Sequence, residues 1–219
     1  MRNNRSLLVV VLLTLGLASC KTSTDPGTGT GGSGNVVQPK SGSTFTYSAS
    51  QNGSMSTIVH TVSQTGMSYQ NKSGVMHITA NQSGQQQDAY MAYDNTGDLE
   101  YWAPLDLSTL GLTPTWVRFP FGSGQAFHLS QDGNFNGQNV NVTYDITSTA
   151  ASKVTVKGTE YTAENAHLVM AATMNYAGQT VPMSSSTVDY SFIPQLGYFA
   201  KINSTNPPMV ETLTDFSLK

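Results

Sequence analysis

The 219-residue chain holds a single cysteine and three arginines, and charged residues make up 11% of it. One thiol cannot form a disulfide within the chain, so the fold has no internal covalent crosslink. Two of the arginines, Arg2 and Arg5, lie at the N-terminus, and the rest of the chain carries 8 basic against 13 acidic side chains. Nucleic-acid binding requires a basic surface, and this composition therefore excludes it.

Long apolar runs are also missing. The longest extends from Leu7 to about Ala18, and its roughly 12 residues are too few for a membrane-spanning helix, which needs about 20. The preceding arginines and the small residues that follow complete the three-part layout of a secretory signal peptide. The sequence Leu17-Ala18-Ser19-Cys20 resembles the bacterial lipobox, which implies that Cys20 is lipidated and becomes the first residue of the mature protein. A plain secretory signal with a chance cysteine is the alternative.

Residues 20–40 follow as a segment rich in Gly, Ser and Thr. Such a segment buries too little apolar surface to offset the entropy of ordering it, and about 20 flexible residues span roughly 25 Å. We expect a signal peptide over 1–19, a lipidated Cys20 with a flexible tether over 20–40, and a single domain over 41–219. The acyl chains implied by the lipobox, palmitate among them, would anchor the protein to a membrane. Lys21 follows the cysteine, which favours the outer over the inner membrane of a bacterial cell envelope.

The dominant hydrophobic period of residues 41–219 is two. Apolar and polar side chains alternate over several runs, among them 139–146, 166–176, 187–192 and 196–203. Strict alternation is typical of antiparallel strands that bury one face and expose the other. Turn sequences such as Asn52-Gly53, Ala177-Gly178 and Asp132-Gly133-Asn134 separate the runs, and such residues suit tight hairpins.

This pattern predicts an all-β protein of roughly ten to twelve strands. A succession of hairpins with one apolar face curls that face inward, so we expect an antiparallel up-and-down sheet that is strongly curved into a half-barrel or barrel. The sequence offers at most one short helix, over Leu105 to Leu110.

The last third of the domain resembles bacterial envelope lipoproteins. In that pattern a Gly-Thr-Tyr-like turn, here residues 158–161, leads into a long strand at 166–176, and an aromatic strand with a Pro-x-Leu-Gly turn follows at 188–202. The closing strand lies at 211–218. The wider group is similar in architecture to the lipoprotein-localisation factors, which are half-barrels that hold acyl chains. Those half-barrels cover their open mouth with several helices, whereas this sequence offers at most one short helix.

Motifs for catalysis are absent from the sequence. It contains no Gly-x-Ser-x-Gly elbow and no phosphate-binding loop between a strand and a helix, so we expect neither an enzyme nor a cofactor. Asp94, Asp98 and Glu100 cluster oxygen ligands of the kind Ca²⁺ prefers. Their spacing is not that of a calcium-binding loop, and a hairpin turn is the favoured interpretation. The four histidines have no local zinc-ligand spacing.

Two functional hypotheses remain. The first is a small lipid-like molecule bound within the curved sheet, where adaptable methionines and an aromatic strand with one arginine would contact it; the candidate residues are Met76, Met170, Met174, Trp116, Arg118 and Phe119. The second is a structural module with a filled core, which binds an envelope protein partner at a sheet edge or loop. The shape of the interior separates the two.

Overall fold

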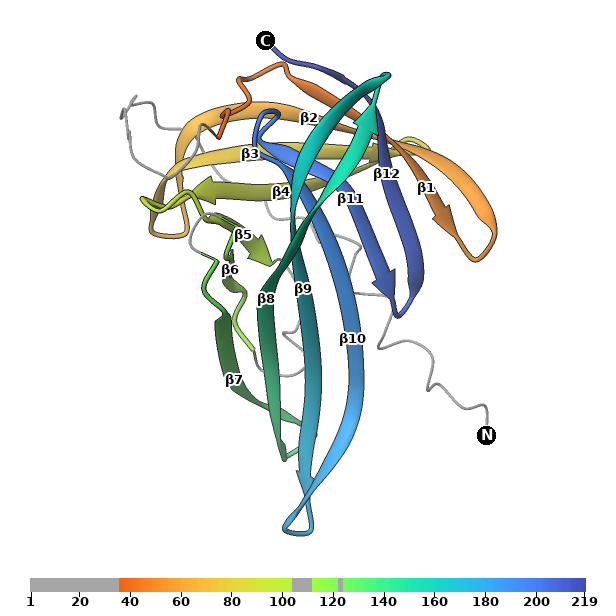
Figure 1. Cartoon of the computed structure of the whole chain (residues 1–219). Helices are drawn as coiled ribbons and strands as arrows, with labels where there is room; N and C mark the ends of the chain where they lie inside the picture. The colour runs from red at the N-terminus through yellow and green to blue at the C-terminus, as the bar shows by residue number, and fades with distance from the viewer. Residues whose placement is uncertain (1–35, 104–111, 122–123) are drawn as a thin grey trace.

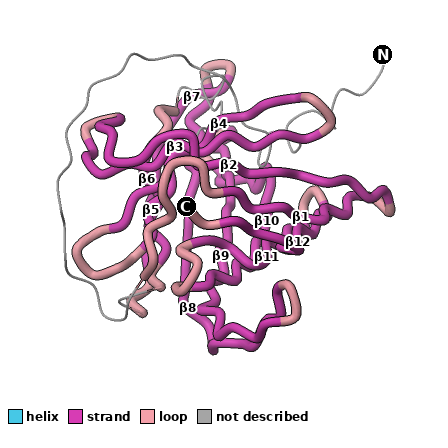
Figure 2. The backbone as a smooth tube through the Cα atoms, turned by 90° about the horizontal axis from the view of Figure 1, so that it is seen from above, coloured by secondary structure: helices cyan, strands magenta, loops and turns pink. Residues whose placement is uncertain are grey.

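The computed structural model describes residues 36–103, 112–121 and 124–219. In these ranges the chain forms strands and loops, with no helix (Figure 2). Cys20 and the expected helix at 105–110 lie outside the described residues. Within them, no helical segment has the length and apolar character to cross a membrane. The twelve strands are β1 (Thr44–Gln51), β2 (Ser54–Tyr69), β3 (Lys72–Gln82), β4 (Gln85–Tyr93), β5 (Leu99–Ala103), β6 (Thr115–Phe119), β7 (Phe127–Phe135), β8 (Gln138–Val156), β9 (Thr159–Tyr176), β10 (Gln179–Ile193), β11 (Tyr198–Thr205) and β12 (Pro208–Ser217).

All twelve strands belong to one antiparallel sheet, in the order β6-β5-β4-β3-β2-β1-β12-β11-β10-β9-β8-β7. Strands that follow each other in sequence are therefore neighbours in space, except that β1 pairs with β12 and that β6 and β7 are the two edges. The sheet forms a nearly closed barrel with one seam between these edges. The predicted up-and-down, strongly curved all-β fold is confirmed.

Side chains span the seam. Ser148 Oγ of β8 donates a hydrogen bond to the Pro120 carbonyl oxygen, 2.7 Å away, just after β6. Gln131 of β7 donates through Nε2 to the Thr113 carbonyl oxygen, 3.1 Å away, just before β6. These side-chain hydrogen bonds link the two edges of the sheet, although β6 and β7 are not paired through their backbones.

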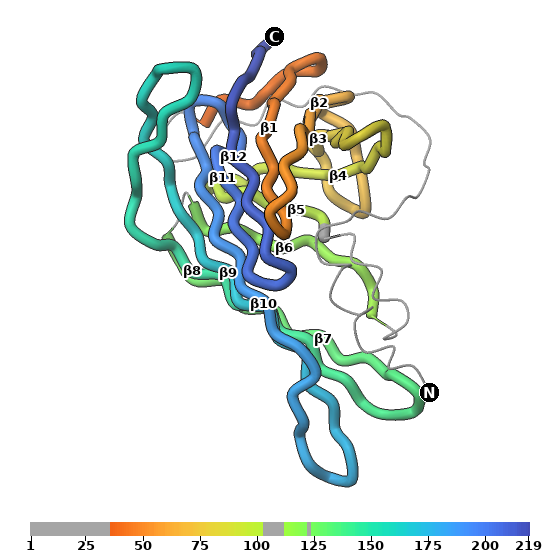
Figure 3. Tube along the Cα trace, turned by 90° about the vertical axis from the view of Figure 1, so that its right-hand side faces the viewer, coloured from red at the N-terminus to blue at the C-terminus, as the bar shows by residue number. Residues whose placement is uncertain are grey.

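The strands cross as two layers. Strands β2, β3 and β4 run across one end of the molecule, and β8, β9 and β10 run nearly at right angles to them (Figure 1). Strands β8–β10 are 15 to 19 residues long, and they extend well past β11 and β12 (Figure 3). The hairpin between β9 and β10 forms the tip of this extension.

The chain enters the barrel at the opposite end. Residues 36–40, the last part of the predicted tether, pack against the turn between β10 and β11, where Val37 N donates to the Pro194 carbonyl oxygen at 2.8 Å. A Cβ atom at Gly197 would lie 1.7 Å from the Val37 carbonyl oxygen, and Gly197 has a φ of +59°. Only glycine fits this close approach of two backbones. The C-terminal Lys219 N lies 3.2 Å from Ser43 Oγ at the same end.

One part of the sheet is buried on both faces, which differs from the expected alternation of buried and wet positions. Ala89, Tyr90, Met91 and Ala92 of β4 are all buried, and an outer cluster covers their outward side. The cause is the bulged end of β2, where the register with β3 shifts repeatedly and the side chains fold back over the sheet. The outer cluster consists of Val75, Tyr90, Ala92 and Trp102 with Met67, Tyr69 and Trp116.

One expected turn is misplaced. The sequence Asp132-Gly133-Asn134 lies inside β7 and pairs with β8, and the chain turns at Asn136 and Gly137, both with positive φ. Asn134 Oδ1 accepts a hydrogen bond from Gly137 N at 2.8 Å, so Asn134 supports the turn from the strand end.

Candidate functional site

Aromatic rings fill the barrel interior at the end where the chain enters. Phe45 stacks on Tyr198 with ring centroids 4.0 Å apart, and Phe121 stacks on Phe192 at 4.9 Å. Phe199 contacts both stacked pairs edge-on. Stacked and edge-on rings at these distances are in close packing contact. This aromatic layer is therefore occupied by the protein's own side chains.

Tyrosine hydroxyl groups in and around the aromatic layer form hydrogen bonds with backbone carbonyl groups and with one histidine. Tyr47 donates its hydroxyl proton to the Phe199 carbonyl oxygen at 2.6 Å, and Tyr93 donates to the Gly197 carbonyl oxygen at 2.7 Å. His60 Nδ1 lies 3.1 Å from the Tyr198 hydroxyl oxygen. Burial lowers the pKa of His60 to about 4, so the imidazole is neutral at neutral pH.

A carboxyl group lies next to this layer, inside the barrel. Glu211 of β12 is paired with Ala49 of β1 and with Ile202 of β11, both of which face the core. Its side chain makes no hydrogen bond or ion pair within the described part of the chain, and only 6% of the residue is exposed. Loss of hydration on burial raises the pKa of Glu211 to about 7.

Two inward-facing polar side chains of this region lack a hydrogen-bond partner in the described part of the chain. Ser204 Oγ is fully enclosed without one, and the buried Glu211 makes no hydrogen bond or ion pair there. Buried polar groups without a partner are uncommon in folded proteins, so this part of the interior is the candidate site.

Two tyrosines interact electrostatically with Glu211. Burial raises the pKa of Tyr101 from β5 and of Tyr190 from β10, and the nearby Glu211 charge raises both further. Neither hydroxyl has a hydrogen-bond partner among the described residues. We refer to Glu211, Tyr101 and Tyr190 as the Glu211 centre. Small side chains stand beside it, because Ala49 pairs with Glu211 and Ala166 pairs with Tyr190.

Arg118 and the carboxylates proposed for calcium bind one another. Arg118 Nε lies 2.7 Å from Asp98 Oδ2 and 3.2 Å from Asp94 Oδ2, and its Nη2 also contacts Asp98. Asp98 is fully enclosed. Asp94 Oδ1 accepts hydrogen bonds from the Thr96 backbone and hydroxyl at 2.8 and 2.6 Å, which lowers the pKa of Asp94 although partial burial opposes the shift. This cluster closes the turn between β4 and β5.

The third carboxylate, Glu100, pairs with Lys72, whose ammonium lies 5.2 Å from the ring centroid of Trp116. Trp116 belongs to the outer cluster and contacts Trp102, so it points away from the barrel interior. No group of three or more His, Cys, Asp or Glu side chains suited to a metal occurs in the described ranges.

The other residues predicted to contact a ligand are Met76, Phe119, Met170 and Met174. Met76 and Phe119 are buried in the core, and Phe119 contacts Phe121 and Phe199 of the aromatic layer as well as Tyr190, whose ring centroid is 4.7 Å away. Met170 is buried on β9, and Met174 is partly buried further along the same strand. Their role in binding stays a prediction.

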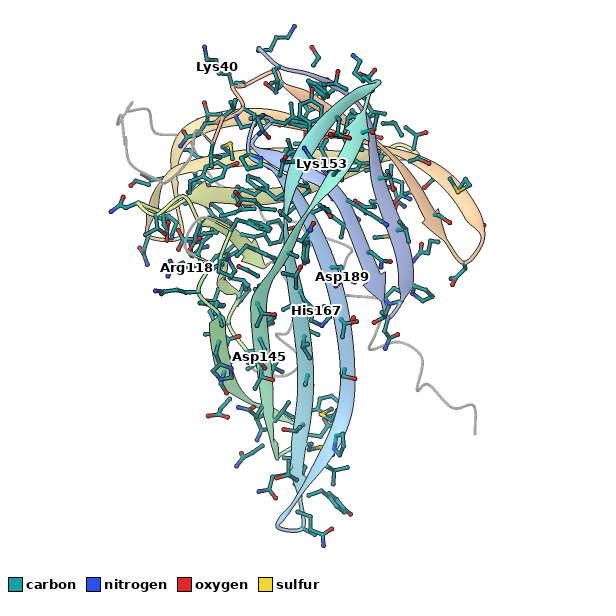
Figure 4. All side chains as sticks on the ribbon, in the orientation of Figure 1. Lys40, Arg118, Asp145, Lys153, His167 and Asp189 are labelled. Atoms are coloured by element: carbon teal, nitrogen blue, oxygen red, sulfur yellow. The ribbon has the colours of Figure 1, made fainter. Side chains whose placement is uncertain are left out.

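The histidines other than His60 pair with aspartates across neighbouring strands. His77 lies 2.9 Å from Asp88, His128 lies 2.6 Å from Asp145, and His167 lies 2.7 Å from Asp189. Figure 4 shows His167 and Asp189 together on the outside of β9 and β10. These pairs lie on the face of the sheet opposite the core.

Sequence reasoning missed the Glu211 centre, although one signal was present. Met209, Glu211 and Leu213 alternate with Val210, Thr212 and Thr214, and the structure buries the first set. An acidic residue on the apolar phase of a strand is costly to bury and is therefore informative. The tyrosines carried no such signal, because buried tyrosine is common.

No protein-family model matches the chain, and no curated protein matches it. Solved structures do. A candidate lipoprotein from Parabacteroides distasonis aligns with a TM-score of 0.51 at 9% identity, over 82% of this chain and 96% of that one. A candidate exported protein with a YmcC-like fold from Bacteroides fragilis aligns with a TM-score of 0.44 at 9% identity, over 82% of this chain and 97% of that one. The hypothetical lipoprotein YmcC of Escherichia coli aligns with a TM-score of 0.34 at 8% identity, over 83% of this chain and 89% of that one.

At these identities the likeness concerns the fold. The predicted resemblance to the architecture of bacterial envelope lipoproteins is confirmed at that level by the Parabacteroides protein. The comparisons assign no ligand or activity to the barrel.

Proposed function

We propose that this protein is a lipoprotein of the bacterial cell envelope, anchored through Cys20, whose barrel binds an amphiphilic small molecule without catalysis. The observation that carries the proposal is the carboxyl of Glu211, buried inside the barrel with no partner in the described part of the chain. An unpaired polar group costs free energy on burial. A protein that keeps one in its interior gains most when a ligand completes its hydrogen bonds.

The anchor fits this arrangement. Residues 36–40 are fixed to the end of the barrel that holds the aromatic layer, and a Gly/Ser-rich tether of about 15 residues, as the sequence predicts before them, would span roughly 20 Å. The barrel would thus sit close to the membrane, where amphiphiles partition. Lys21 after the lipidated cysteine supports the outer membrane.

A neutral fluorophore tests ligand binding. Nile red emits strongly in apolar surroundings, and we expect the protein to enhance its emission saturably. Ala49→Leu places a larger side chain beside Glu211 and should abolish the enhancement, whereas Ala171→Leu, on the outer side of β9, should leave it intact. Circular dichroism verifies that both variants fold. Equal enhancement by the two variants, or none by the natural protein, contradicts the proposal.

A second candidate is a structural module that binds an envelope protein. The filled aromatic layer and the outer cluster around Trp102 favour it, because both add rigidity without requiring a ligand. Absence of Nile red binding, with an intact fold, would favour this second candidate.

A further inference from the structure

We propose that the Glu211 centre recognises a primary ammonium group, so that the ligand is an amphiphile with a cationic head. This inference rests on the proposed function and specifies the chemistry of its ligand. Glu211 lies on the inward phase of β12 without a partner in the described part of the chain, and Ile202 pairs with both Glu211 and Tyr190, which places these two residues in one row of the sheet. The carboxylate is an acceptor without a donor. A primary ammonium has three N–H donors and no acceptor, so it suits such a group.

Charge favours the same ligand. A buried carboxylate is stable only when it is paired with a cation or fully hydrogen-bonded. The lysines and arginine of the described ranges that form ion pairs do so elsewhere, with Glu100, Asp98, Glu160 and Asp215, and none contacts Glu211. An ammonium group delivered by a ligand would supply the missing positive charge.

The surrounding rings add a further attraction. The titratable groups whose pKa the Glu211 charge affects are tyrosines from four strands: Tyr47 of β1, Tyr101 of β5, Tyr190 of β10 and Tyr198 of β11. Burial raises the pKa of each, so all four are neutral at neutral pH. Neutral aromatic rings stabilise a nearby cation through their π faces. They would give no such stabilisation to an anionic head.

The side chains next to the Glu211 centre suit an apolar tail. The next row of inward side chains, on the side away from the aromatic layer, is apolar except for Ser204. This row consists of Met209, Ser204, Val188, Leu168 and Ile146, all buried. The head would therefore lie at Glu211, against the aromatic layer, and the tail would run toward the extended part of β8–β10.

Matched head groups test the inference. Dodecylamine, dodecanol and dodecanoate share one chain length and compete for Nile red. A charge-assisted hydrogen bond adds about 1.5–3 kcal/mol over none, which corresponds to an affinity ratio of about tenfold or more. We expect dodecylamine to displace the probe at about tenfold lower concentration than dodecanol near pH 8.5, and dodecanoate to be the weakest. Near pH 5.5, where Glu211 is protonated, the preference should shrink.

Two variants supply the controls. Glu211→Gln keeps the size of the side chain and removes its charge, and it should reduce the amine preference to within about twofold. Glu164→Gln removes a carboxyl that also faces the core, opposite Phe192, and should preserve the preference. If all three amphiphiles bind equally, or if Glu211→Gln retains the preference, the inference is wrong and the proposed function stands. If none displaces the probe, the proposed function itself fails.

Discussion

Replacing Glu211 with glutamine is expected to stabilise the barrel at neutral and alkaline pH. The pKa of Glu211 rises from an ordinary value of 4.5 to about 7 in the folded protein, because burial disfavours the charged form. Between these values the folded state holds a proton that the unfolded chain has released. The free energy of unfolding therefore falls as the pH rises through this window.

The size of the effect follows from the same two values. At about 1.4 kcal/mol per pKa unit, the ionised Glu211 costs the fold about 3 kcal/mol above pH 7. Glutamine carries no charge and avoids this cost. For a domain of this size, the change corresponds to a rise in Tm of roughly 6–12 °C at about pH 8, and to little change at about pH 4.5.

His60 has the opposite dependence on pH. Burial lowers its pKa from 6.5 to about 4, so the unfolded chain binds a proton that the folded state rejects, and the free energy of unfolding rises with pH between these values. In the natural protein the two effects nearly cancel from about pH 4.5 to 6.5. Glu211→Gln should unmask the rise due to His60, and His60→Gln should unmask the fall due to Glu211.

Urea denaturation followed by tryptophan fluorescence measures these changes across the pH range. Parallel curves for the natural protein and Glu211→Gln would refute the reasoning, because they would mean that Glu211 titrates at its ordinary value in the folded state. Such a result would require a partner for the carboxyl and would remove the main support for the binding centre.

Three further perturbations test other parts of the structure. Gly197→Ala should lower Tm well beyond Gly178→Ala, since both have positive φ but only Gly197 meets another backbone; equal losses would contradict the packing of residues 36–40. Asp98→Asn should cost about 3–5 kcal/mol, because it leaves Arg118 without its enclosed partner, and a loss below about 1 kcal/mol in urea denaturation would contradict this. Cys20→Ser should move the protein from the membrane fraction to the soluble fraction, and mass spectrometry should find no acyl group on the variant. If Cys20 of the natural protein carries no acyl group either, the proposed lipid anchor is wrong.

The architecture of the domain could be predicted because it depends on local patterns. Alternation such as that of Val140, Val142, Tyr144 and Ile146 determines which face of a strand is buried, and hairpin turns determine that neighbours in sequence are neighbours in the sheet. Errors were local. Asp132-Gly133-Asn134 has the composition of a turn but continues β7, since pairing with β8 outweighs turn propensity.

The candidate site depended on distant parts of the chain. Amino-acid sequence by itself determined the inward phase of most strands and is the basis of the predicted export signal and lipidation motif, because these are properties of residues close together in the chain. Only the tertiary structure placed Tyr190 of β10 in one row with Glu211 of β12, and only it engaged Arg118 with Asp94 and Asp98. Closure of the sheet decides which inward side chains meet across the barrel, and periodicity within one strand carries no information about the opposite wall.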